Sequence, residues 1–239
     1  MSGTLPRRRR IYLMRHGSVD YFLADGTPVA PDTVPLNETG RQQADAAGEL
    51  FKAAGVRFDR VVVSGLPRTV ETASRVLAAA GQAQLPLVQE PRLQEIRGGR
   101  LSDIPKEQLR GAFLGAFQGT VDESSRFLGG ESIGEMQDRA LPAFQELLRD
   151  EGWQQLLLVL HGGVNRALLS YALAGQRCFL GRMEQAPACI NVMDISSEDM
   201  VVRGINLAPT QWLHERERYT TMEKLLAQYL RMEGSTPRS

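Results

Sequence analysis

Short runs of apolar residues alternate along the chain with longer segments in which apolar and polar positions are mixed. A short continuous apolar run is typical of a strand that is buried on both faces, as in a parallel sheet. Such runs predict strands at residues 11–14, 58–63, 85–88 and 156–160, followed by a hairpin formed by residues 189–195 and 200–205.

Helix signals fill the intervals between the predicted strands. The segment that opens at Thr39 fits a capping box, Gly55 fits a helix stop, and Pro67 stands where a first-turn proline is tolerated. Ser132 and Glu135 fit a second capping box. We therefore expect helices at residues 39–54, from 67 to just before 81, from 132 to about 149, at 164–173 and at 222–232.

This alternation predicts an α/β fold, specifically a three-layer α/β/α sandwich with a mainly parallel sheet. Residues 98–130 interrupt it, because glycines punctuate them and only one amphipathic stretch, near 104–117, is present. We interpret them as a small inserted cap over the sheet edge. At 239 residues and 42% hydrophobic composition, the chain is expected to form one domain over residues 1–239, ending in a helix and tail at about 209–239.

Composition restricts the classes of partner and the cellular location that we expect for this protein. Lys and Arg total 28, as do Asp and Glu, so the chain lacks the basic excess typical of proteins that bind nucleic acid or anionic membranes. Cys178 and Cys189 lack the spacing of metal ligands or of a disulfide framework, and we interpret them as buried thiols. No signal-peptide core or membrane-spanning run occurs, so we expect a cytoplasmic protein. The predicted hairpin offers a sheet edge at which a homodimer could form.

Two of the three histidines directly follow predicted strands. His16 ends the first run within an Arg-His-Gly triplet, and His161 ends the run at 156–160 ahead of two glycines. Either histidine alone fits a core or turn position, but the carboxyl edge of an open α/β sheet is where ligands bind. Arg68 stands in the first turn of the helix that follows another strand, where anions are favoured. Together these positions predict a phosphate pocket.

Six motifs, in this order, resemble those of the histidine phosphatase superfamily, also called the phosphoglycerate mutase-like family. The resemblance extends from residue 11 to about residue 166 and implies a three-layer α/β/α fold, no metal, no cofactor, and a reaction through a phosphohistidine. The motifs lie at residues 13–17, 35–44, 64–73, 93–95 leading to 99, 130–132 and 161–163.

The resemblance also implies roles for single residues. The nucleophile would be His16, kept neutral by two neighbouring guanidinium groups, and Glu95 would protonate the leaving alcohol and then activate water. The acidic residues that compete with Glu95 by sequence proximity are Glu90, Asp103, Glu107 and Glu131. The residues expected to hold the phosphoryl group or the rest of the substrate are Arg15, Arg68, His161, Gly162 and Ser18.

The chain departs from the glycolytic mutases of this family directly after the first motif. Those enzymes continue with Gly-Glu-Ser and carry an asparagine six residues after the nucleophile, whereas this chain has Ser18, Val19 and Phe22. The loss of these polar groups indicates a less polar or bulkier leaving group. We therefore expect a metal-independent phosphatase acting on a small phosphorylated substrate. Two alternatives stay open: a mutase-like phosphotransferase, and a binding module that keeps the pocket but has lost turnover.

Other conspicuous polar residues receive structural interpretations. Glu131 and Ser132 are expected to serve the start of a helix, His214 to be solvated, and Arg126 and Arg166 to form surface ion pairs. Substrate specificity is assigned to segments without a readable pattern, namely residues 18–34, 98–130 and the tail after Pro209.

Overall fold

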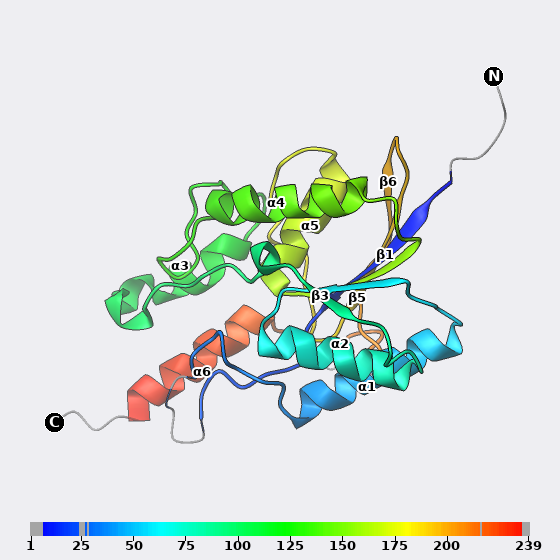
Figure 1. Ribbon diagram of the computed structural model, residues 1–239. Coiled ribbons are helices and arrows are strands. Elements are labelled where there is room, and N and C mark those ends of the chain that lie inside the picture. The colour runs from blue at the N-terminus through cyan, green and yellow to red at the C-terminus, as the bar shows by residue number, and fades with distance from the viewer. Residues whose placement is uncertain (1–6, 24–26, 28, 216, 236–239) are drawn as a thin grey trace.

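A six-stranded sheet forms the centre of the molecule in the computed structural model, which describes residues 7–23, 27, 29–215 and 217–235 (Figure 1). The strand order is β3-β2-β4-β1-β5-β6. β3, β2, β4 and β1 are parallel neighbours, and β5 is antiparallel to both β1 and β6, so the sheet is mostly parallel with a hairpin at one edge. The strands are β1 (Arg9–Arg15), β2 (Arg60–Val63), β3 (Leu87–Gln89), β4 (Gln155–Leu160), β5 (Ile190–Ile195) and β6 (Met200–Leu207).

Both faces of the central strands are buried, which explains why they are almost wholly apolar. Along β1, Ile11 and Leu13 join one hydrophobic core, and Tyr12 and Met14 join the other. Successive side chains of a strand point to opposite faces, so a strand between two helical layers needs apolar residues at every position. The predicted three-layer α/β/α sandwich is confirmed.

Helices α1 and α2 cover one face of the sheet, and α4 and α5 cover the other (Figure 1). The capping box predicted for α4 is present: the Ser132 hydroxyl accepts from the Glu135 amide at 3.1 Å, and the Glu135 carboxylate accepts from the Ser132 amide at 2.8 Å. No described helix is long and apolar enough to cross a membrane. The helices are α1 (Glu38–Ala53), α2 (Pro67–Ala79), α3 (Leu109–Leu114), α4 (Ile133–Arg149), α5 (Gly162–Ala174) and α6 (Thr221–Ser235).

The start of α1 corrects one sequence prediction. The capping residue is Asn37, whose side-chain oxygen accepts from the Gly40 amide at 2.8 Å, and Thr39 lies inside the first turn. A capping box at Thr39 was therefore wrong, because Asn37 offers the same acceptor two positions earlier and satisfies a free helix amide first. The strand predicted from residue 58 begins at Arg60.

The segment between residues 98 and 130 contains short helical pieces rather than one long helix. Its main helix is α3, preceded by 3₁₀ turns at Leu101–Asp103 and Lys106–Gln108 and followed by one at Gly115–Phe117. Phe113 of α3 packs against the C-terminal helix α6 in a small separate hydrophobic cluster. The segment and α6 therefore support each other beside the main sandwich.

Candidate active site

The two candidate histidines leave neighbouring strands side by side. Arg15 at the end of β1 is paired with Leu160 at the end of β4, so the residues that follow, His16 and His161, emerge at the same sheet edge. Their ring centroids are 5.3 Å apart with an interplanar angle of 62°. The parallel register thus brings together two motifs that are far apart in the sequence.

His16 is buried, and its hydrogen bonds define which ring nitrogen is free. Nδ1 lies 2.7 Å from the carbonyl oxygen of Gly17. A carbonyl only accepts, so Nδ1 carries the proton and Nε2 of the neutral ring carries the lone pair. Burial, followed by the positive charges of Arg68 and Arg15, holds the pKa of His16 well below its ordinary value of 6.5. His16 therefore presents an unprotonated Nε2 at neutral pH.

His161 is fully buried and is oriented by a serine from the adjacent strand end. Its Nε2 lies 2.7 Å from the hydroxyl oxygen of Ser64, which in turn lies 3.0 Å from the Thr69 hydroxyl of α2. Nδ1 of His161 is buried without a partner among the described residues. Burial and then the charge of Arg68 lower the pKa of His161 well below 6.5. The serine thus leaves Nδ1 as the free nitrogen of the ring.

Arg15 and Arg68 are both buried, and each is held through its own Nη1 atom. Arg15 Nη1 donates to the carbonyl of Gln185 at 2.5 Å and to the hydroxyl of Thr221 at 2.9 Å, and Arg68 Nη1 donates to the carbonyl of Pro31 at 2.5 Å. The Nε atoms of both arginines are buried without a partner within the described chain. Nε and Nη2 form the edge of a guanidinium that binds an oxyanion bidentately.

The unpartnered atoms indicate what the site binds. Buried N–H donors are almost always satisfied in native proteins, and an unmet one costs about 1–3 kcal/mol. Here the N–H groups of Arg15 Nε and Arg68 Nε lack a partner within the described part of the chain, and so does the ring nitrogen Nδ1 of His161. All three atoms belong to residues that the sequence assigned to one phosphate pocket. The arrangement suits a multiply charged oxyanion that accepts hydrogen bonds from several sides.

Glu95 lies at the start of α5, next to His161. Its carboxylate accepts from the backbone amide of Gly163 at 3.0 and 3.1 Å and from that of Val164 at 3.3 Å. The approach depends on Gly163, because a Cβ at that position would lie 2.7 Å from Glu95 Oε1. Of the competing carboxylates, Glu90 is paired with Arg92.

Another competitor, Glu131, has a structural partner as well. It forms an ion pair with Arg139 at 2.8 Å and accepts from the Arg97 amide at 2.9 Å, contacts that hold its pKa below the ordinary value despite its burial. The structural interpretation of Glu131 is confirmed, although its partners are arginine and backbone groups rather than a helix dipole. Among these carboxylates, Glu95 is the one hydrogen-bonded beside His161.

The two further predicted substrate contacts differ in how the structure places them. Gly162 is the first residue of α5, and a Cβ there would lie 3.6 Å from Arg15 Nε, so its backbone borders the arginine. Ser18 is half-buried, and its backbone binds the side chain of Gln43 and the amide of Asn37. These contacts fix the position of the Ser18 backbone, and a role for its hydroxyl stays a prediction.

A buried amide cluster behind Arg15 escaped the sequence reasoning. The side chains of Gln185 and Asn191 hydrogen-bond to each other at 2.8 and 2.9 Å, and Asn191 also donates to the carbonyl of Leu13 in β1. The cluster holds the Gln185 carbonyl that accepts from Arg15. Amides dispersed among apolar residues carry no sequence signal, whereas Ser64 stood in a recognised motif directly after a strand.

Three minor sequence interpretations need correction. Arg166 is not a surface residue: it is only 7% exposed and donates to the carbonyls of Gly162 and Gly181 as well as pairing with Glu184. His214 is half-buried, with Nε2 3.1 Å from the carbonyl of Asn206. Cys178 is only half-buried, although Cys189 is buried as expected. Arg126 does form the expected exposed ion pair, with Glu135.

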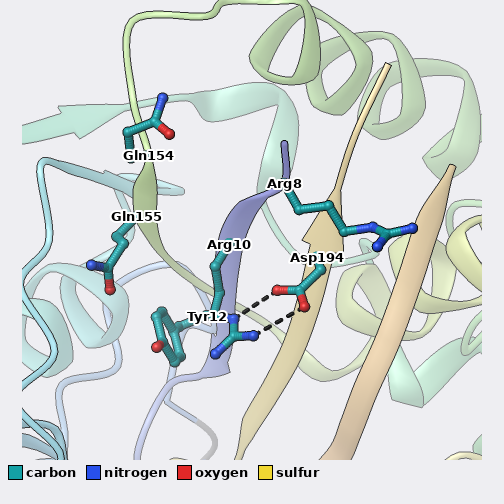
Figure 2. Close-up of a pocket in the computed structure, with 6 residues that line it drawn as sticks. All are labelled: Arg8, Arg10, Tyr12, Gln154, Gln155 and Asp194. Carbon is teal, nitrogen blue, oxygen red and sulfur yellow. Dashed lines mark hydrogen bonds and ion pairs between the residues drawn. The ribbon is translucent and has the colours of Figure 1, made fainter. Parts of the chain in front are cut away.

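A separate cavity lies at the opposite edge of the sheet. Its volume is about 400 Å³, and it lies beside the amino-terminal half of β1. Figure 2 shows the residues that line it, among them Arg10, which is paired with Asp194. None of the candidate site residues lines it. No group of three or more His, Cys, Asp or Glu side chains suited to a metal ion occurs among the described residues. The residues that line the cavity are Arg8, Arg10, Tyr12, Gln154, Gln155 and Asp194.

The fold and the edge site define an α/β protein with a histidine and arginine pocket for an oxyanion. A family model, that of the histidine phosphatase superfamily (branch 1), matches residues 11–208. The chain belongs to this superfamily. A 2,3-bisphosphoglycerate-dependent phosphoglycerate mutase of Methylobacterium sp. (strain 4-46) is 34% identical over 166 residues, which cover 67% of this chain and 79% of the mutase.

Solved structures of phosphatases are similar to this chain as well. A putative alpha-ribazole-5'-P phosphatase from Escherichia coli K-12 matches with a TM-score of 0.60 and 25% identity, over 84% of this chain and 97% of that one. A mycobacterial glucosyl-3-phosphoglycerate phosphatase in complex with VO3 matches with a TM-score of 0.64 and 26% identity, over 83% and 99%. The relatives thus include both phosphatases and mutases.

Proposed function

We propose that this protein is a phosphatase that hydrolyses a phosphomonoester through a phosphohistidine on His16, without a metal. Nε2 of His16 attacks phosphorus and forms a P–N bond while the P–O bond to the leaving group breaks. Glu95, as a carboxylic acid, gives its proton to the leaving oxygen. Water then attacks the phosphohistidine, Glu95 takes a proton from it, and the P–N bond breaks to release inorganic phosphate.

The observation that carries this proposal is the set of buried, unpartnered nitrogen atoms, two of them guanidinium donors, that accompanies a neutral nucleophile. Arg15 Nε, Arg68 Nε and His161 Nδ1 have no described partner, and His16 holds its lone pair on Nε2. Phosphoryl transfer depends mainly on positioning and on stabilising the charge of the equatorial oxygens. Two guanidinium groups supply that positive charge from the protein itself, so the proposed reaction needs no divalent ion.

Hydrolysis is favoured over transfer to a second hydroxyl by the residues that follow the nucleophile. Phe22 stands where glycolytic mutases of the family carry a polar group, and its ring lies 6.4 Å from that of Tyr229 in α6. An aromatic pair at that place suits an apolar or bulky leaving group. The mutase alternative is supported by relatives of that name at 30–34% identity, so the test must measure both phosphate release and phosphoryl exchange.

The test measures phosphate release and phosphoryl exchange with a panel of phosphomonoesters in EDTA. It compares the wild type with His16→Ala and with the matched control His214→Ala. We expect the wild type and the control to release phosphate and His16→Ala to lose activity by more than about 100-fold, as removal of an essential group does. Acid-labile, base-stable labelling of the wild type by a radioactive substrate would report the phosphohistidine.

Other outcomes would overturn this proposal. Activity that disappears in EDTA and returns with a divalent ion would refute the metal-independent mechanism. Phosphoryl exchange with little net release would favour the mutase. Tight binding of phosphate esters with neither release nor labelling would favour a binding module.

A further inference from the structure

Helix α6 contacts the candidate site although it lies outside the family match. The matched residues end at 208, and α6 begins at Thr221. The hydroxyl of Thr221 lies 2.9 Å from Arg15 Nη1, across 206 positions of the sequence. The guanidinium of Arg15 is therefore contacted by a part of this chain that the family model does not match.

The hydrogen bonds of Arg15 give this contact a directional effect. Nη1 carries two hydrogens, and they are taken by the carbonyl of Gln185 and the hydroxyl of Thr221. With Nη1 held at two points, the guanidinium plane is fixed and the opposite edge, Nε and Nη2, is presented as a bidentate fork. Nε is the buried atom without a described partner. Thr221 thus helps to orient the Nε and Nη2 edge of Arg15.

Thr221 is itself held by a second, partly buried contact. Its hydroxyl donates to Glu184 Oε1 at 3.4 Å, and the other oxygen of Glu184 accepts from Arg166 at 3.2 Å. Arg166 also donates to the carbonyl of Gly162, the residue after His161. A hydroxyl that donates to a carboxylate is a better acceptor for a guanidinium, because hydrogen bonds in a chain polarise one another. The chain of contacts joins α6 to both strand ends of the site.

Packing fixes α6 in the position that this contact requires. Leu226 is buried against Phe113 and Leu114 of α3, and the ring of Tyr229 lies 6.1 Å from that of Phe113 and 6.4 Å from that of Phe22. The first turn of the helix is capped by Thr220 and Glu223, whose side chains bind each other's backbone amides. Thr221 is therefore on a supported helix rather than on a loose tail.

We propose that Thr221 is a positioning residue for Arg15, so that helix α6 completes the phosphoryl-binding site. This inference rests on the proposed function, in which Arg15 binds the phosphoryl oxygens. Thr221 acts on the affinity of the site for an oxyanion. Without the Thr221 acceptor, the guanidinium of Arg15 rotates about its remaining hydrogen bond to Gln185. The Nε and Nη2 edge is then aligned with the oxyanion only part of the time.

The test compares Thr221→Val, which keeps the volume and removes the hydroxyl, with Thr221→Ser, which restores it. Thr39→Val, an exposed position on α1, is the matched control. Orthovanadate binding is measured by calorimetry on the full chain, so the readout does not need turnover, and KM and kcat follow for an active phosphomonoester. We expect Thr221→Val to bind orthovanadate roughly tenfold more weakly, since one bond to a charged group is lost, and Thr221→Ser to bind as the wild type does.

The outcomes separate this inference from the proposed function. A wild type that does not bind orthovanadate contradicts the proposed pocket as a whole. Wild-type binding that is unchanged in Thr221→Val refutes the positioning role alone. If Thr221→Ser weakens binding while Thr221→Val and Thr39→Val do not, the methyl packing and not the hydroxyl matters, and the inference is also wrong.

Discussion

At the scale of single residues, the candidate site is defined by nitrogen atoms that have no partner among the described residues. The backbone carbonyl of Gly17 binds Nδ1 of His16, Ser64 binds Nε2 of His161, and each arginine is held through Nη1. None of these bonds uses an atom that the proposal assigns to the phosphoryl group. The protein therefore orients the pocket before any ligand arrives, which is how an electrostatic site avoids reorganisation during the reaction.

Ser64→Ala tests this orientation for His161. The change leaves Nε2 buried without its partner and frees the ring to turn, so we expect kcat/KM to fall about tenfold, the equivalent of one hydrogen bond of about 1.4 kcal/mol. The control is Ser170→Ala, which removes an equally buried hydroxyl that binds Leu180 and Arg166 instead of a candidate site histidine. Equal losses of kcat/KM in the two variants, after correction for folded fraction, would refute a specific role for Ser64.

At the scale of elements, the start of α5 combines two functions. His161 is the N-cap residue of this helix, and the Glu95 carboxylate accepts from its free first-turn amides. These hydrogen bonds satisfy first-turn N–H groups of α5 and fix the position of the Glu95 side chain. One helix end thus positions both His161, the proposed phosphoryl-binding histidine, and Glu95, the proposed proton donor.

Gly163→Ala tests that arrangement, because the new Cβ would lie 2.7 Å from Glu95 Oε1 and displace the carboxylate. We expect kcat/KM for alkyl phosphates to fall on the order of tenfold or more, since general acid catalysis is lost. The loss should be smaller for p-nitrophenyl phosphate, whose leaving group needs no proton. Gly111→Ala, which has open space around the new methyl, is the control. The same loss for both substrate types would contradict Glu95 as the proton donor.

At the scale of the whole molecule, two buried neutral histidines couple folding to pH. The pKa values of His16 and His161 are well below 6.5 in the folded protein because of burial and the nearby arginines. Below about pH 6.5 the unfolded chain takes up protons on these residues and the folded chain does not, so the free energy of unfolding decreases as the pH falls. The phosphate pocket is therefore expected to carry a cost in stability.

Urea unfolding between pH 7.5 and 5.5 measures this cost. We expect the free energy of unfolding to fall by up to about 1.4 kcal/mol per pH unit for each of the two histidines at the acid end. His16→Gln removes one titrating group and should reduce the slope by about half. The carboxylates lose their ion pairs only at lower pH. A free energy that stays level over this range would show that the two rings do not remain neutral in the folded protein.

The sequence predicted the elements well where a local signal existed. The capping box of Ser132 and Glu135, the first-turn position of Pro67 and the apolar central strands depend on neighbouring residues alone, and the structure contains all three. The start of α1 was missed because two adjacent capping sequences compete and only the folded backbone selects Asn37. The burial of Arg166 was missed because the sequence around a charged helix residue does not show which distant residues pack against it.

The sequence alone determined the family motifs, the parallel strands and the placement of His16 and His161 at strand ends, since short-range patterning sets all of these. Tertiary structure decided what surrounds them. Ser64 meets His161 across 97 positions, Gln185 meets Arg15 across 170, and Thr221 meets Arg15 across 206. A motif marks Ser64, His161 and Arg15 as single positions but does not say which residue each one contacts, and Gln185 and Thr221 lie in no motif. The contacts exist only because the sheet register and the packing of α6 bring distant segments together.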